Sequence, residues 1–317
     1  MKRFLLFCIW GFGCISAEVK HLELEAGITP WTRQSLPLTT LTYQIQAGVE
    51  TPIINAQDLA RIHQWVPGLF ARVAILPTDE YGIEGRYLGL LEWSRVYAIS
   101  TTSNAFTYSL AITPSSPILF TGASQVIEDY KMRYESADLL FLWNISPLYD
   151  KFFGVRGLLG PSYIYLQDKL DQTISSVTFL KEYSIQSTNH FAGLRAYGEW
   201  IGTPEPFIWG LRGSFGVYAD IYKQVSTVSQ SIPESAMQNF SYVAKNVWPS
   251  TIFQGDVFLG INLFDSLRIK GAFGGQWLNY LGSALSQPGR GFQRSSIDRK
   301  NHYVFYGATI SLEWDLF

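Results

Sequence analysis

The side chains best suited to chemistry are charged residues within a repeated pattern: an aliphatic residue, a charged residue, then a small residue. The pattern occurs as Ile83-Glu84-Gly85, Val155-Arg156-Gly157, Leu194-Arg195-Ala196, Leu211-Arg212-Gly213 and Ile269-Lys270-Gly271. Successive side chains of a β-strand point to opposite faces, so each charge lies on one face and its two neighbours on the other. Charged groups that line a water-filled lumen orient solutes, and arginines favour anions. The pattern therefore indicates a lumen wall.

Applied to the whole chain, the same alternation predicts a set of inward charges that line a pore. They are Glu84, Arg86, Arg156, Arg195, Glu199, Arg212, Asp220, Asp256 and Lys270. Arg156, Arg195 and Arg212 fall on three consecutive predicted strands at similar heights, which predicts a basic stripe on one interior wall. The alternative is a salt-bridge network that fills a narrow barrel without conduction, and the sequence leaves both open.

Enzymatic hypotheses find little support in the residues. The chain has no Gly-x-Ser-x-Gly and no His-Glu-x-x-His motif. Asn189 and His190 are adjacent, so alternation places their side chains on opposite faces, where they cannot cooperate. Both cysteines, Cys8 and Cys14, lie in the first segment of the chain. We expect no catalytic, cofactor-binding or metal-binding residues, and the chain is not expected to be an enzyme.

The elements that would position these charges are long alternating strands. Phe207, Trp209, Leu211 and further apolar residues up to Ile221 share one face, opposite polar residues. Crossing a membrane takes about nine to eleven tilted residues, whereas ordinary strands have about five or six. Aromatic residues near the strand ends suit the two membrane interfaces. They are Trp93, Tyr97, Trp143, Phe152, Trp200, Phe207, Trp277, Tyr280, Tyr306 and Trp314.

The fold class predicted is all-β: a transmembrane antiparallel up-and-down β-barrel of about twelve strands, with ten as the alternative. The strands expected are 20–26, 38–50, 65–76, 81–97, 104–112, 130–145, 150–167, 182–200, 206–222, 251–264, 267–281 and 301–316. Long loops at 113–129, 168–181, 224–250 and 282–300 alternate with short turns, as extracellular loops and periplasmic turns do. The connection at 77–80 should be an outer loop but is short. Residues 55–63 are expected to form a short helix, folded under or into the barrel.

The first residues are expected to form a signal peptide. Lys2 and Arg3 precede an apolar run from Phe4 to Ile15, which ends at small residues. We assign residues 1–17 to the signal peptide and 18–317 to the barrel domain. Charged residues make up only 16% of the chain and the net charge is −2, which argues against a nucleic-acid partner.

Several segments resemble one family of bacterial outer-membrane β-barrel proteins, grouped with pore-forming major outer-membrane proteins. Tyr81 to Gly89 is similar to that family's early hairpin. Gly260-Ile261-Asn262-Leu263 with Leu267-Arg268-Ile269-Lys270 resembles its penultimate hairpin. Other similar segments are Glu135 to Asp138, Gly160 to Leu166 and Thr188 to Gly193. The resemblance implies an outer-membrane barrel, porin-like in function, and brings no catalytic residues.

The function expected is a porin-like diffusion channel for small solutes, with a partly basic lumen wall, in the outer membrane. The alternatives are a non-conducting structural or adhesive surface barrel and, less favoured, an outer-membrane enzyme. The partners expected are outer-membrane lipid, small solutes or ions, and the barrel-assembly machinery through the C-terminal strand. The terminal Phe317 fits such an assembly signal, although it is out of phase with the outward residues Trp314 and Leu316.

Overall fold

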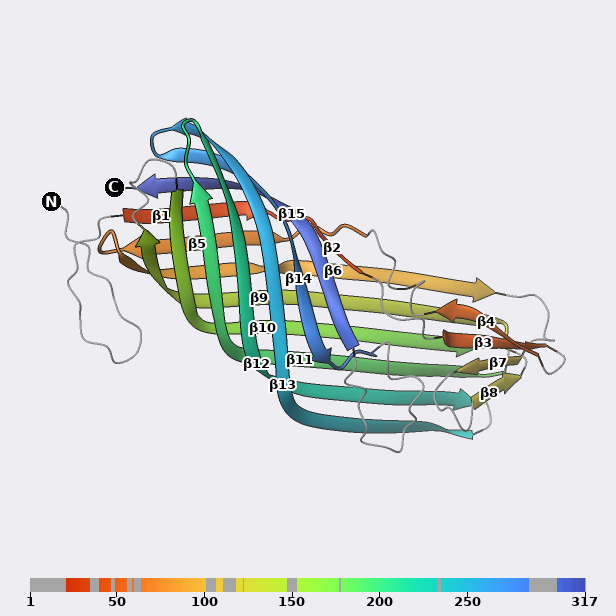
Figure 1. Ribbon diagram of the computed structural model, residues 1–317. Coiled ribbons are helices and arrows are strands. Elements are labelled where there is room, and N and C mark those ends of the chain that lie inside the picture. The colour runs from red at the N-terminus through yellow and green to blue at the C-terminus, as the bar shows by residue number, and fades with distance from the viewer. Residues whose placement is uncertain are drawn as a thin grey trace.

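Eleven strands form one antiparallel sheet that closes on itself (Figure 1). The computed structural model describes residues 21–34, 40–46, 49–55, 59, 64–100, 107–110, 118–121, 123–146, 153–176, 178–232, 235–284 and 301–316. In ring order the strands are β1 (His21–Ile28), β5 (Leu69–Leu76), β6 (Tyr81–Ser100), β9 (Gln125–Ser146), β10 (Phe153–Ser175), β11 (Leu180–Gly202), β12 (Phe207–Ile232), β13 (Ser235–Phe264), β14 (Leu267–Leu281) and β15 (Asn301–Leu316). The ring closes because β1 pairs with β15 as well as with β5.

The remaining strand, β2 (Trp31–Arg33), continues β1 along the same edge of β15, opposite residues Phe305–Gly307. Among the described residues the eleven strands therefore occupy ten positions around the ring, the smaller of the two numbers considered from the sequence. The predicted up-and-down antiparallel barrel is confirmed, since strands that follow one another around the ring pair antiparallel. No helix in the described part of the chain is long and apolar enough to cross a membrane.

The described residues of two segments predicted as barrel strands, 38–50 and 104–112, belong to a second sheet instead. Its strand order is β4 (Val49–Asn55), β3 (Thr40–Gln46), β7 (Thr107–Leu110) and β8 (Ile118–Thr121). Figure 1 shows this small sheet beside the far ends of the long strands, and the buried Ile54 of β4 packs with Val126 and Ile174. The alternation of a short strand fixes its two faces but not the sheet that it joins, so the sequence could not separate these strands from the barrel.

The short connection at 77–80 lies at the end of the barrel where β15 finishes. His21 pairs with Leu76, and the next residue, Leu22, pairs with Leu316. The turn at 77–80 is therefore on the same side as the β9–β10, β11–β12 and β13–β14 connections, which we call the short-turn end. The sequence analysis expected an outer loop at 77–80. A short turn fits there because the segments before β5 and β9 add no further position to the ring.

Two segments predicted as long outer loops are strands. β12 and β13 stay paired from Phe207 and Ile261 to Ile232 and Ser235, so most of 224–250 is a hairpin. β10 and β11 likewise pair through Ser175 and Leu180. These extensions suggest loops in the sequence because they carry many Ser, Thr and Gln residues, on both faces. The predicted signal peptide and Phe317 lie outside the described residues. So does the predicted helix, apart from Leu59, which is buried in the core with Trp31 and Trp93.

The outer surface of the ring carries a wide band of exposed apolar side chains, here called the apolar belt. It starts at the short-turn end and includes Val73, Ile83, Leu139, Phe141, Leu159, Leu194, Trp200, Leu211, Phe215, Val217, Ile221, Val247, Val257, Leu259, Phe273 and Ile310. On six neighbouring strands it is interrupted by polar residues that pair in register, here called the polar row, and Val96 and Val243 are exposed beyond that row. The polar row consists of Glu92, Arg133, Gln167, Thr188, Lys223 and Lys245.

Candidate functional site

The interior of the barrel at the short-turn end is filled by charged side chains from most of the ring. The nine predicted inward residues all lie on the inner face of the ring, and seven of them are almost completely buried: Glu84, Arg86, Arg156, Arg195, Glu199, Asp220 and Lys270. The other two, Arg212 and Asp256, keep 12% and 10% of their side-chain surface exposed. The alternation of the strands positions these residues, because successive side chains point to opposite faces of the wall.

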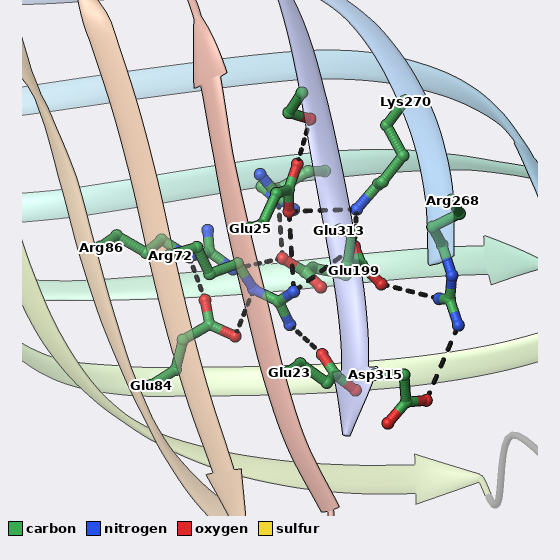
Figure 2. A network of polar contacts seen from close by, with 12 residues as sticks. Glu23, Glu25, Arg72, Glu84, Arg86, Glu199, Arg268, Lys270, Glu313 and Asp315 are labelled. Atoms are coloured by element: carbon green, nitrogen blue, oxygen red, sulfur yellow. Dashed lines mark hydrogen bonds and ion pairs between the residues drawn. The ribbon is translucent and has the colours of Figure 1, made fainter. Parts of the chain in front are cut away.

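Arg72 on β5 is the centre of the resulting network (Figure 2). Its guanidinium lies 2.5 Å from Glu23 Oε2 and 2.9 Å from Glu84 Oε2. Glu25 and Glu313 complete the ring of carboxylates around it, with oxygens 3.6 and 3.7 Å from Nη1. All five side chains are almost fully buried. Because buried charges are tolerated only when they are paired, each member of this group depends on the others.

The predicted basic stripe is wrong, because carboxylates alternate with the arginines across the strands. Arg156 pairs in register with Glu199, Glu199 with Arg212, and Arg212 with Asp256. The Arg212 Nε donates to Glu199 Oε1 over 2.5 Å. Arg195 lies four residues along β11 from Glu199, in a different layer. The sequence placed the arginines at similar heights but could not show which residues separate them.

Some ion pairs join strands that are not neighbours in the ring. Arg86 on β6 donates to Glu199 on β11, three positions away around the ring. The ammonium of Lys270 on β14 lies 2.6 Å from Glu313 and 3.2 Å from Glu25 on β1. Figure 2 shows side chains from several strands converging on one another, so the network occupies the lumen instead of lining an open passage.

A second polar layer lies beyond this network, away from the short-turn end. Tyr197 is held between two guanidinium groups, with Arg86 4.4 Å and Arg195 4.8 Å from its ring centroid. The hydroxyl of Tyr197 donates to Asp138 Oδ2 over 2.5 Å. Arg195 also lies 3.7 Å from Asp138 and donates to Ser214 over 3.0 Å. The carboxylate of Asp138 therefore neutralises Arg195.

Next along the lumen comes a buried apolar layer. The ring of Phe305 lies 5.2 Å from Tyr134 and 5.5 Å from Trp93, centroid to centroid. Arg33 of β2 also points inward: it donates to the Tyr130 hydroxyl over 2.7 Å and lies over the Tyr130 ring. The buried residues of this layer include Leu91, Trp93, Tyr130, Met132, Tyr134, Ile164, Leu166, Phe191, Tyr303 and Phe305. The lumen is therefore packed first by charges and then by rings.

Two cavities flank the charged network. One, of about 180 Å³, opens among Glu23, Asp79, Arg156 and Arg268 at the short-turn end. The other, of about 70 Å³, lies beside Ser136, Arg195 and Gln254. Both are small beside ligand pockets, which usually measure about 300–1,000 Å³. In the described part of the chain, no group of three or more His, Cys, Asp or Glu residues is arranged to hold a metal ion.

The sequence analysis did not identify Glu23, Glu25 or Arg72, although the signal was present. Leu22 and Leu24 face outward on β1, and the two glutamates lie between and after them. Arg72 has the same position between apolar neighbours on β5. Conversely, Asp220 is not part of the network: it pairs in register with Phe191 and Trp248, well above the arginines.

Comparisons with protein-family models and with curated proteins found no match. Among solved structures, the outer-membrane protease OmpT of Escherichia coli is similar, with a TM-score of 0.42 and 11% identity over 96% of this chain and 99% of that one. A FadL homologue of Pseudomonas aeruginosa has a TM-score of 0.29 and 7% identity over 94% and 90%. The Pseudomonas putida toluene transporter TodX has a TM-score of 0.22 and 7% identity, over 93% of this chain and 90% of that one. At these scores the similarities do not bear on the activity of this chain.

Proposed function

We propose that the protein is a non-conducting outer-membrane β-barrel that holds a rigid sheet on the cell surface. The observation that carries this proposal is the network around Arg72, which occupies the lumen with paired charges. The proposal takes up the structural or adhesive alternative from the sequence and assigns no catalytic step to the chain.

Placement in a membrane is supported by the apolar belt. Leu194, Trp200 and Leu259 are each 61% exposed on the outer face of the ring, a costly arrangement in water. Along β12 the outward apolar positions run from Phe207 to Ile221. This segment is longer than the roughly nine to eleven residues that a strand needs to cross a bilayer. A closed ring also leaves no unpaired strand edge in the hydrocarbon region.

A porin-like channel is the competing function, and the interior argues against it. An open pore needs a continuous water-filled passage, whereas the charges meet in the middle of the lumen and buried rings follow them. The alternation of Arg156, Glu199, Arg212 and Asp256 also leaves no single-sign wall that would select anions. The apolar rings add a second closure that does not depend on charge.

A role at the cell surface is supported by the strands that continue past the polar row. β12 runs from Lys223 to Ile232, nine residues further, and β13 returns beside it. At about 3.3 Å per residue this hairpin projects roughly 30 Å. Among the residues that the structure describes, β6 pairs only with β9 after Leu91, and β13 pairs only with β12 before Ile252. The projection is therefore an open sheet with two edges, a shape suited to contact with other molecules rather than to transport.

The experiment that tests the proposal is single-channel recording with the purified protein in a planar bilayer. Samples are first checked for folding by the difference in electrophoretic mobility before and after boiling, because a closed barrel resists detergent until it is heated. We expect folded protein to insert without conductance steps. Regular steps from heat-modifiable protein would establish the porin-like channel in place of the proposed function. Lipase and protease assays on the same samples test the enzymatic alternative, and we expect no turnover.

A further inference from the structure

Two lysines face outward on neighbouring strands where the polar row interrupts the apolar surface. Lys223 on β12 and Lys245 on β13 are directly opposite one another in the antiparallel register, and both side chains are exposed. Like charges placed opposite each other destabilise a sheet. An anion held between the two ammonium groups removes that repulsion. The pair therefore has the charge and the spacing of an anion site.

A second pair of lysines on the same outer surface shows how the chain neutralises such a repulsion by itself. Lys131 on β9 and Lys169 on β10 are also directly opposite one another. Lys131 lies 3.0 Å from Asp129 and Lys169 lies 2.6 Å from Asp171, so each charge has its own carboxylate. Among the ion pairs formed by the described residues, none includes Lys223 or Lys245. Their nearest outward neighbours in register and along the strands are Thr188, Ile221, Val225, Val243 and Val247.

The surface immediately toward the membrane from Lys223 and Lys245 is apolar. Ile221 and Val247 pair in register one step below them and are 48% and 61% exposed. Ala219 and Pro249 follow in the next outward step. A molecule that binds here thus contacts two positive charges at one end and an apolar surface along the rest of its length. This combination fits an anionic lipid and does not fit a free anion, which would leave the apolar surface unused.

We propose that Lys223 and Lys245 bind the phosphate of an outer-leaflet glycolipid headgroup, with its acyl chains against Ile221 and Val247. This inference rests on the proposed function, because it requires the apolar belt to lie in a membrane. Thr188, beside Lys223 in the polar row, supplies a hydroxyl that can donate to the same phosphate. The bound lipid would fasten the projecting hairpin at the height where it leaves the membrane.

The test uses the full-length protein, folded in a neutral detergent, and native mass spectrometry to count bound lipid. The probes are diphosphorylated lipid A, its dephosphorylated form and inorganic phosphate. The variant is Lys223→Gln with Lys245→Gln, and the matched control is Lys131→Gln with Lys169→Gln. At about one kcal/mol for each lysine near a charged lipid surface, the first variant should bind diphosphorylated lipid A roughly 30-fold more weakly. The control should bind as the wild-type protein does.

Each outcome separates the lipid site from the proposed function. Equal binding by the wild-type protein and the Lys223→Gln, Lys245→Gln variant overturns the lipid site while leaving the barrel intact. Equal binding of the dephosphorylated lipid, or full competition by inorganic phosphate, overturns the phosphorylated lipid as the occupant. Should the glutamine variant fail to fold, the variant Lys223→Arg with Lys245→Arg is used, because it keeps both charges and should retain lipid binding. Loss of lipid binding in this arginine variant overturns the site. A wild-type protein without heat-modifiable mobility contradicts the proposed function instead.

Discussion

Glu23 and Arg156 form an ion pair across the lumen, although β1 and β10 are four positions apart in a ring of ten. Arg156 donates through Nη2 to Glu23 Oε1 over 2.9 Å and through Nη1 to Glu23 Oε2 over 3.3 Å. Both side chains are almost fully buried. Glu23 also accepts from Arg72, so one carboxylate joins two arginines from different strands. The interior is thus tied together by charges as well as by the closed backbone.

Removing the centre of this network should destabilise the barrel strongly. In Arg72→Met, the carboxylates of Glu23 and Glu84 lose their nearest cation while they remain buried. Breaking a buried pair in this way typically costs about 3–5 kcal/mol. We expect unfolding in lipid vesicles to reach its midpoint at a clearly lower urea concentration. Heat-modifiable electrophoretic mobility measures the folded fraction. Arg133→Gln is the control, because the Arg133–Glu135 pair is exposed, and its midpoint should be unchanged. A midpoint as high in Arg72→Met as in the wild-type protein would contradict the role given to the network.

The apolar layer should act independently of the charges. Phe305→Ala removes a fully buried ring that contacts Trp93 and Tyr134, and such truncations cost about 3–5 kcal/mol. Phe273→Ala removes a ring of the same size from the apolar belt, where lipid replaces it, and should cost less. Neither variant should conduct in planar bilayers, because the network around Arg72 still fills the lumen. Conductance steps in Phe305→Ala alone would show that the rings, and not the charges, close the barrel.

The apolar belt predicts how the outer surface responds to charge. Leu211→Arg places a cation on the lipid face near mid-depth, at a cost of about 2–4 kcal/mol. Thr227→Arg puts the same residue on the same face of β12, four residues beyond Lys223 in the projecting hairpin. We expect a smaller folded fraction in lipid vesicles for Leu211→Arg and a wild-type fraction for Thr227→Arg. If both variants fold equally well, the belt does not face lipid.

A pH-dependent prediction concerns Asp168, which lies just beyond the polar row and outside the membrane-spanning segment of β10. Its Oδ2 accepts hydrogen bonds from Ser283 Oγ over 2.6 Å, the Ala284 amide over 2.8 Å and the Tyr303 hydroxyl over 3.3 Å. Burial raises the pKa of Asp168 from 3.8 to about 6, against the opposing effect of these hydrogen bonds and of Arg33. The folded state therefore prefers the protonated carboxyl.

The sign of the effect follows from the raised pKa of Asp168. Its contribution to stability is complete below about pH 4 and is lost as the pH rises through about 6, by at most about 3 kcal/mol. Asp168→Asn keeps an acceptor for Ser283 and removes the titration. We expect the thermal midpoint of the wild-type protein, relative to that of Asp168→Asn, to fall between pH 4.5 and pH 7.5. A constant difference between the two proteins across this range would show that Asp168 does not titrate there.

The local pattern of the sequence predicted the faces of the strands well. Glu84, Arg156 and Lys270 point inward and Leu211 points outward, because period-two alternation depends only on neighbouring residues. The same pattern failed at the ends of strands. The extensions of β12 and β13 carry polar residues on both faces, so the residues from 224 to 250 resembled a loop. It also could not assign 38–50 and 104–112 to a separate sheet, since pairing depends on residues far away in the chain.

By itself, the sequence determined that this chain forms a barrel with an apolar exterior and a charged interior, since side-chain polarity and alternation are properties of short segments. Only the tertiary structure decided that Glu199 lies between Arg156 and Arg212, and that Glu23 meets Arg156 from the far side of the lumen. The first relationship depends on the register between neighbouring strands, and the second depends on closure of the ring, which brings together residues more than a hundred positions apart. For that reason, the same charges that predicted an open basic wall are found paired and buried.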